Sequence, residues 1–207
     1  VRLLPRQAAQ LGSRTGAAYA AMFLLTAASM GVSVYGPAIL QTLGGYSALS
    51  AGYIVGVEAL AWTGCAMLVT HLTGAWPGRL IRSGASLLGV SLLVCAWAFP
   101  AMSLVGVLIG TALMGAAFGF SWSFMAQRLL GAVPEDERAI AAAGMTTVRL
   151  TGTAAGAAAS AAVANLAGFA NGFTPESAER AGTWIFLAVL PAALLGAAAA
   201  WRLGSDR

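Results

Sequence analysis

The chain has 207 residues, of which 59% are hydrophobic and 9% are charged, and its formal net charge is +4. Soluble domains carry about 25% charged residues, so this composition excludes a water-soluble protein and indicates an integral membrane protein. All eleven basic residues are Arg. In such an apolar chain, their excess indicates membrane topology rather than binding to nucleic acid.

The apolar stretches predict six membrane-spanning helices. A hydrocarbon core of about 30 Å needs about 20 helical residues to cross it. Stretches of roughly this length cover residues 17–40, 49–70, 84–99, 103–126, 140–167 and 183–201. We therefore expect an all-α membrane domain over 17–201, preceded by a cytoplasmic linker over 1–16 and followed by a cytoplasmic tail over 202–207.

The positions of the arginines predict the orientation of these spans. If the spans alternate in direction, nine arginines fall on one side of the membrane: Arg2, Arg6, Arg14, Arg79, Arg82, Arg128, Arg138, Arg202 and Arg207. The loops on the other side hold only Arg180. The positive-inside rule then places both termini in the cytoplasm of a bacterial-type plasma membrane.

Small residues at four-residue spacing predict close packing between the helices. They form the sets Gly52/Gly56, Gly106/Gly110, Gly115/Gly119 and Gly152/Gly156/Ser160. Small side chains let two helix backbones approach closely, which favours helix association in lipid. The acidic cluster at 135–137 is interpreted as capping the start of the fifth span, where carboxylates are favoured by the helix dipole.

Two stretches at helix junctions resemble the major facilitator superfamily of transporters. Residues 35–41 read YGPAILQ and residues 45–52 read GYSALSAG, similar to the junction of the seventh and eighth helices of drug:proton antiporter-type members. Residues 133–138 read VPEDER, followed by AG at 143–144 and RLTG at 149–152, similar to the junction of the tenth and eleventh helices. With the six spans, the resemblance extends over nearly the whole chain.

The loop between the second and third spans departs from the family pattern. In the family, this loop often has Asp-Arg after a Gly, whereas residues 74–82 here read GAWPGRLIR. No acidic residue occurs between Glu58 and Glu135. The cytoplasmic latch that this acid supports in the family is therefore not expected here.

The resemblance implies the C-terminal six-helix half of a secondary transporter, built of two inverted three-helix repeats. Such a half needs a second wall, which is either a missing N-terminal half or a second copy of the chain. The implied function is transport of a small apolar or amphipathic molecule, coupled to protons. The alternatives are a standalone six-helix exporter and a membrane subunit of another transport system.

Glu58 and Arg149 are the candidate proton-coupling residues. A charge at the centre of a spanning helix costs about 2.5–3.5 kcal/mol on insertion scales, so such residues usually mark a functional pathway. Each lies nine residues into its span, from opposite sides of the membrane, and we expect the two to meet near the midplane. The resemblance places their helices on the transport cavity. The alternative interpretation is a static ion pair, or an Arg149 that reaches to the inner surface.

Three aromatic residues are candidates to line the same cavity. Trp62 lies one turn after Glu58 on the same helix face, and Tyr35 and Trp122 are the others. For all three the alternative is ordinary helix packing.

The sequence predicts neither an enzyme nor a resident metal or cofactor. The single His71 cannot build a zinc site of three or four ligands. An intramembrane serine hydrolase would need His71 as its base. That residue lies at the edge of the second span, and no GxSxG turn accompanies it.

Overall fold

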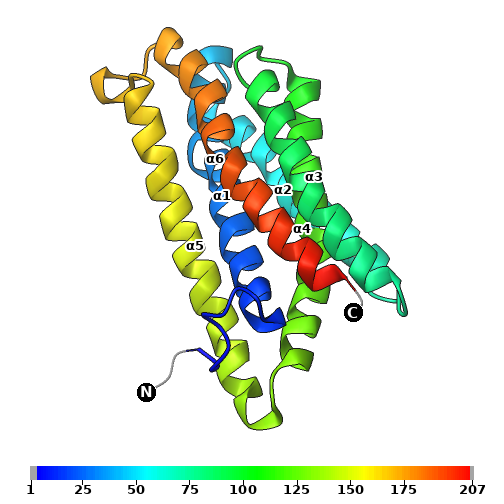
Figure 1. Ribbon diagram of the computed structural model, residues 1–207. Helices are drawn as coiled ribbons and strands as arrows, with labels where there is room; N and C mark the ends of the chain where they lie inside the picture. Colours follow the sequence, from blue (N-terminus) through cyan, green and yellow to red (C-terminus); the bar gives the residue numbers. More distant parts are fainter. Residues whose placement is uncertain (1–3, 206–207) are drawn as a thin grey trace.

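The computed structural model describes residues 4–205, which form six long α-helices and no β-strand (Figure 1). The helices are α1 (Arg14–Gly44), α2 (Ala48–Val69), α3 (Trp76–Ala98), α4 (Leu104–Ala132), α5 (Arg138–Leu166) and α6 (Pro175–Gly204). Two single-turn 3-10 helices, η1 (Glu135–Glu137) and η2 (Phe169–Asn171), precede and follow α5. The expectation of an all-α fold is confirmed.

Five of these helices are long and apolar enough to cross a membrane, namely α1, α2, α3, α4 and α6. This indicates a membrane protein. Helix α5 has 29 residues, which also suffices to cross a bilayer. Its many Ala, Gly and Thr residues, with Arg138 and Arg149, make it less apolar than the others. A sixth membrane crossing by α5 therefore stays a prediction.

Four of the helices begin at a hydroxyl residue that caps them. The caps are Ser13 for α1, Ser47 for α2, Ser103 for α4 and Thr174 for α6. Each side chain accepts a hydrogen bond from the backbone N–H three residues later, which satisfies a donor that the helix leaves free. These local signals explain why α1, α2 and α4 begin close to the predicted starts of their spans.

Two helices begin well before their predicted spans. Helix α3 starts at Trp76 instead of residue 84, and α6 starts at Pro175 instead of residue 183. Hydropathy marks only the apolar part of a helix, whereas the first turns of α3 and α6 are charged and have Pro near the start, where it is well tolerated. Consequently Arg79, Arg82 and Arg180 lie within helices and not in the loops.

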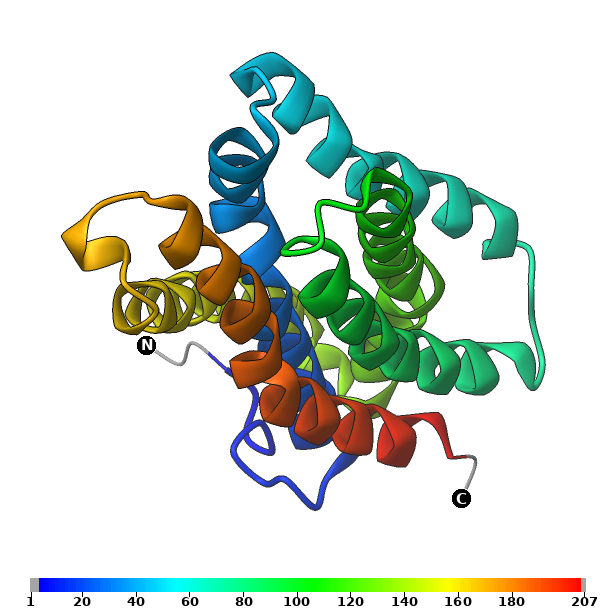
Figure 2. The same ribbon diagram turned by 90° about the horizontal axis from the view of Figure 1, so that it is seen from above.

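The first three helices and the last three pack in corresponding ways. Helix α3 packs against α4 as α6 packs against α1; α2 packs against α4 as α5 packs against α1; and α3 and α6 pack against each other. Exchanging α1–α3 with α4–α6 leaves these main pairings unchanged. Viewed from above, α2 and α5 lie on opposite sides of the bundle (Figure 2).

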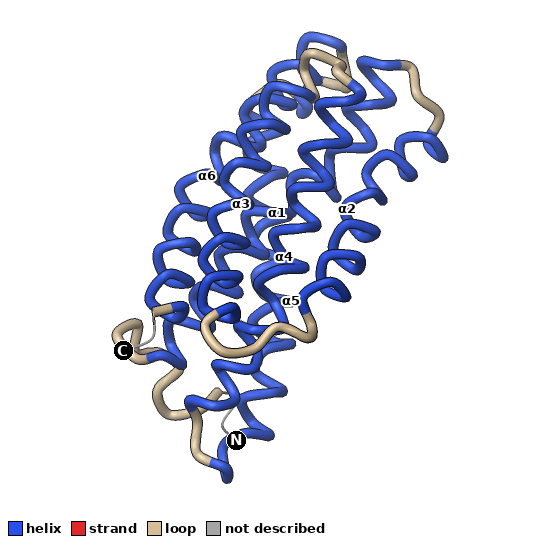
Figure 3. The backbone as a smooth tube through the Cα atoms, turned by 90° about the vertical axis from the view of Figure 1, so that its right-hand side faces the viewer, coloured by secondary structure: helices blue, strands red, loops and turns tan. Residues whose placement is uncertain are grey.

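The helices run roughly along one common axis, with α2 at an edge of the bundle (Figure 3). The α2–α3 and α4–α5 connections lie at the same end of the bundle as the first and last described segments (Figures 1 and 3). Most arginines belong to these segments, so they gather at one end. We call this the arginine-bearing end; which side of the membrane it faces stays a prediction.

Three of the four predicted small-residue sets pack against neighbouring helices. In α4, Gly106 and Gly110 face α3. A Cβ at Gly115 or Gly156 would overlap the backbone carbonyl of a neighbouring helix, that of Glu58 in α2 or that of Ala27 in α1, respectively.

The predicted packing role of Gly52 and Gly56 is wrong within this chain. A Cβ at either position would meet no atom within 4 Å. The spacing is correct for a packing motif, but both glycines point to the side of α2 that faces away from α4. In α2, only Ala51 and Val69 are buried.

The segment before α1 folds back onto the connection between α4 and α5. Glu137 accepts a hydrogen bond from the Arg6 backbone N–H at 3.2 Å, and its carboxylate lies 3.4 Å from the Arg6 guanidinium. The Glu137 side chain is only 14% exposed. Glu137 makes no side-chain cap at the start of α5, so the expected capping role is replaced there by an ion pair. The predicted linker is thus attached to the helical unit from at least Arg6 onward.

Candidate functional site

Glu58 lies near the middle of α2, on the side that packs against α4. Its backbone carbonyl touches Gly115, and the absence of a side chain there allows the close contact. The residue is partly exposed. Glu58 therefore lies on the side of the bundle formed by α2 and α4.

Arg149 lies in α5 on the other side of the bundle and is exposed. Within its own helix, its backbone carbonyl accepts a hydrogen bond from the Thr153 hydroxyl at 3.0 Å.

The expected meeting of Glu58 and Arg149 does not occur within the described chain. Helices α2 and α5 share no contact there, and Figure 2 shows them on opposite sides of the bundle. Counting residues along two spans predicts where each residue lies along its own helix, but it does not predict which helices are neighbours. A static Glu58–Arg149 ion pair is excluded for the same reason.

Trp62 and Trp122 are brought together between α2 and α4. Trp62 stacks on Phe118 with ring centroids 4.9 Å apart, and it lies 6.1 Å from Trp122 in a tilted arrangement. Phe118 and Trp122 lie 6.2 Å apart. These three rings form an aromatic cluster one turn from Glu58. Both tryptophan side chains are partly exposed, whereas Phe118 is buried.

Phe118 was not among the predicted site residues. It lies four residues before Trp122 on α4, so helical spacing places both rings on one face. That spacing could have identified Phe118 as a partner for an aromatic residue on α2. The sequence gives no signal that α2 is the helix opposite.

Tyr35 belongs to a separate group of rings. Its ring lies 5.7 Å from that of Phe169 in η2, which in turn lies 4.3 Å from Phe173. This group lies at the end of the bundle opposite the arginine-bearing end, where the α5–α6 connection meets α1. Tyr35 therefore does not join Trp62 and Trp122 in one site.

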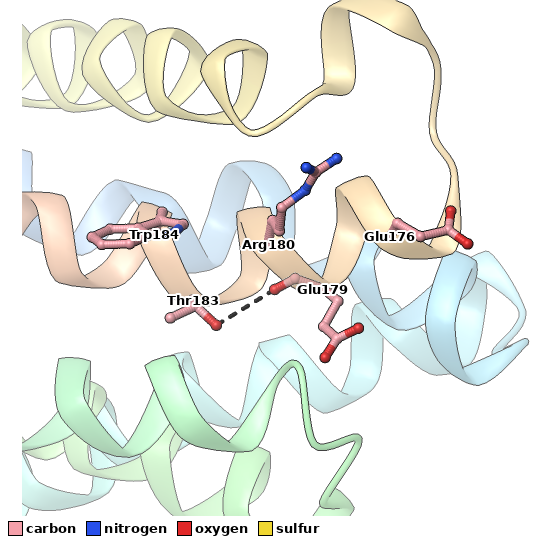
Figure 4. Close-up of a pocket in the computed structure, with 5 residues that line it drawn as sticks. All are labelled: Glu176, Glu179, Arg180, Thr183 and Trp184. Carbon is pink, nitrogen blue, oxygen red and sulfur yellow. Dashed lines mark hydrogen bonds between the residues drawn. The ribbon is translucent and has the colours of Figure 1, made fainter.

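A cavity of about 550 Å³ lies at the start of α6 and is lined by Glu176, Glu179, Arg180, Thr183 and Trp184 (Figure 4). None of the predicted site residues lines it. Figure 4 shows Arg180 and Glu179 pointing to opposite sides of the helix, so the charged groups do not converge on a ligand.

Glu176 lies exposed in the first turn of α6. Hydrogen bonds from its own backbone N–H and from the Thr174 hydroxyl, together with the charge of Arg180, lower the pKa of the Glu176 carboxyl. An ionised acid in a first helical turn also interacts favourably with the helix dipole. Glu176 thus has a structural role at the helix start.

No metal site can be assigned to residues 4–205, since no three His, Cys, Asp or Glu side chains among them are arranged to hold a metal ion. His71 follows the end of α2 and is exposed. The sequence matches no model of a known protein family and no curated protein.

Proposed function

We propose that this chain is one six-helix half of a proton-coupled secondary transporter of the major facilitator type, which moves a small apolar or amphipathic molecule across a plasma membrane. The observation that supports this most is that the main helix pairs remain the same when α1, α2 and α3 are exchanged with α4, α5 and α6. Two three-helix units with opposite directions through the membrane are the expected source of such a pattern, since three is an odd number of crossings.

The exposed side of α2 supports a transporter in which further helices complete the substrate path. Helix α2 covers α4 with one side, while residues along its other side are exposed, including Gly52 and Gly56. Helix α5 is likewise exposed on the side that faces away from α1. In the proposed transporter, six further helices, from the same protein or from a second copy, lie across these faces and complete the substrate path.

Glu58 is the proposed proton-binding residue. It is the one acidic residue in the middle of a long helix among residues 4–205, and ionisable groups at that depth are usually functional. In the proposed path, Trp62 and Trp122 offer ring faces to an apolar or cationic substrate. Arg149 acts separately on the α5 side, because it does not reach Glu58 within the chain.

The test is proton-coupled transport by the full-length protein in liposomes. Ethidium serves as the transported lipophilic cation and internal pyranine reports the pH. We expect an imposed pH gradient to drive ethidium accumulation in wild-type liposomes and to fail to do so with Glu58→Gln. The matched control is Glu176→Gln, which removes an exposed acid at the start of α6 and should transport like wild type. A Glu58→Gln protein that accumulates ethidium at the wild-type rate would remove Glu58 from the coupling step.

A further inference from the structure

Arginine and tryptophan side chains gather where the start of α3 crosses the end of α6. The two backbones touch at Gly78 and Gly204, where a Cβ on either glycine would meet the carbonyl oxygen of the other. Here the Arg82 guanidinium of α3 lies over the Trp201 ring of α6, and Arg79 and Trp76 precede Arg82 on α3 by about one and two turns. We call these four residues the α3–α6 basic patch.

The arginines of the patch are positioned by aromatic rings. The Arg82 guanidinium lies 5.7 Å from the centroid of Trp201, and that of Arg79 lies 5.6 Å from Trp76. The Trp201 indole N–H donates to the Ser86 hydroxyl at 3.0 Å, which fixes the ring. Stacking on an indole orients a guanidinium and leaves its edge free to donate hydrogen bonds.

No acidic side chain among residues 4–205 neutralises the patch. The first turn of α3 has no acidic residue, and neither Arg79 nor Arg82 forms an ion pair within the described chain. Arg82 uses its Nε to donate to the Gly78 carbonyl at 3.2 Å. Arg79 is exposed. Among the residues that the structure describes, the positive charge of the patch therefore has no partner of opposite sign.

An exposed apolar stripe begins directly beside this charge. On α3, Arg82 and Ser86 are followed on the same helix face by Val90, Leu93 and Trp97, which are 49%, 51% and 62% exposed. Residues spaced by three and four lie on one side of a helix. From Arg82 to Trp97 the stripe is about 22 Å long at 1.5 Å per residue, so it reaches through the leaflet that contains the patch.

We propose that the α3–α6 basic patch binds the headgroup of an anionic phospholipid, whose acyl chains lie along the Val90, Leu93 and Trp97 stripe. Planar guanidinium groups match the oxygens of a phosphate, while Trp76 and Trp201, each about half exposed, lie at the level that indole rings prefer in a membrane. The lipid stabilises the crossing of α3 and α6 and so the joint between the first and last three helices. The proposal requires only that the chain spans a membrane, and it is independent of transport.

The experiment measures lipid binding to the purified protein in detergent by native mass spectrometry, with dioleoylphosphatidylglycerol as the anionic probe and dioleoylphosphatidylcholine as the neutral one. One basic residue beside an anionic lipid contributes binding energy that corresponds to about a fivefold change in affinity. We expect Arg82→Gln and Arg79→Gln each to weaken phosphatidylglycerol binding about fivefold and the double variant to weaken it about 25-fold. Binding of phosphatidylcholine should stay unchanged.

The matched control is Arg138→Gln, which removes a charge from the same end of the bundle but outside the patch. Arg79→Gln is the safer of the two patch variants, because Arg82 also holds the Gly78 carbonyl. Equal weakening by Arg138→Gln would show general charge attraction and overturn the proposal, as would wild-type affinity in Arg79→Gln. Displacement of phosphatidylglycerol by inorganic phosphate at equal concentration would assign the patch to a soluble anion instead of a lipid.

Discussion

Helix α2 packs closely against α4, and α5 packs closely against α1. In the first pair the glycines at the contact belong to the inner helix, α4, whereas in the second pair they belong to the outer helix, α5. Where α2 crosses α4, the inner helix supplies Gly115 and Gly119, which touch the α2 backbone at Glu58 and Trp62. Where α5 crosses α1, the outer helix supplies Gly152 and Gly156, which touch the α1 backbone at Phe23 and Ala27. A close crossing therefore needs small residues on only one of its two helices.

This difference explains why Gly52 and Gly56 do not pack within the chain. Because α4 already supplies the glycines for its crossing with α2, the glycines of α2 are not needed there and face outward. The corresponding pair on α5 faces inward. The spacing of small residues therefore identifies a helix face that permits close packing. Whether that face packs depends on where the neighbouring helix lies.

Breaking the α2–α4 crossing should have the largest effect. Gly115→Leu places a branched side chain where even a Cβ overlaps the Glu58 carbonyl, so α2 must move away from α4 and the Trp62–Phe118 stacking is lost. We expect a loss of about 3 kcal/mol or more in the free energy of unfolding, at the upper end of overpacking costs. Unfolding by sodium dodecyl sulfate from mild detergent, followed by tryptophan fluorescence, measures it.

Gly56→Leu is the matched control for Gly115→Leu, since it adds the same side chain to the open face of α2. Its unfolding free energy should not fall below that of wild type and should rise by up to about 1 kcal/mol, because leucine favours a helix over glycine. Equal destabilisation by both variants would mean that the α2 glycines are covered in the isolated protein and that the contrast between the two glycine pairs is wrong.

The sequence predicted an all-helical fold because hydropathy is a local property of the chain. The span at 103–126 and helix α4 begin within one residue of each other, because Ser103 both follows a turn and caps the helix. The ends were less predictable where helices continue past the apolar region. Helix α4 extends to Ala132, and its Arg128 donates to the Leu203 carbonyl at 2.7 Å, a contact between distant parts of the chain.

The positions of the candidate residues along their helices were predictable, but their lateral arrangement was not. Counting residues places Glu58 and Arg149 near the middle of their helices, and the structure agrees. Which helix each side chain faces depends on the order in which six helices pack, and no local pattern encodes that order. For the same reason, the sequence did not show that Tyr35 lies apart from Trp62 and Trp122, or that Phe118 packs against these two tryptophans.

Perturbing the α5–α1 crossing should have an intermediate effect. Gly156→Ala adds only a methyl group, but its position overlaps the Ala27 carbonyl, which cannot move without the α1 backbone. We expect a loss of about 1–3 kcal/mol in the free energy of unfolding, measured by the same detergent titration. Gly131→Ala near the end of α4, where a Cβ meets no atom within 4 Å, should lose none. A stable Gly156→Ala protein would show that α5 is less tightly held than α2.

The smallest effect, and one of opposite sign, is expected from Gly56→Ala. Glycine within a helix costs roughly 0.5–1 kcal/mol relative to alanine, and the new methyl group meets nothing within 4 Å. The isolated chain should therefore gain about that much unfolding free energy, as the detergent titration of the single variant would measure. If a second six-helix unit packs on α2 at this glycine, the bulkier Gly56→Leu should reduce transport by the full-length protein while leaving the isolated chain stable. Destabilisation of the isolated chain by Gly56→Ala would instead mean that the open face of α2 is closed by its own chain.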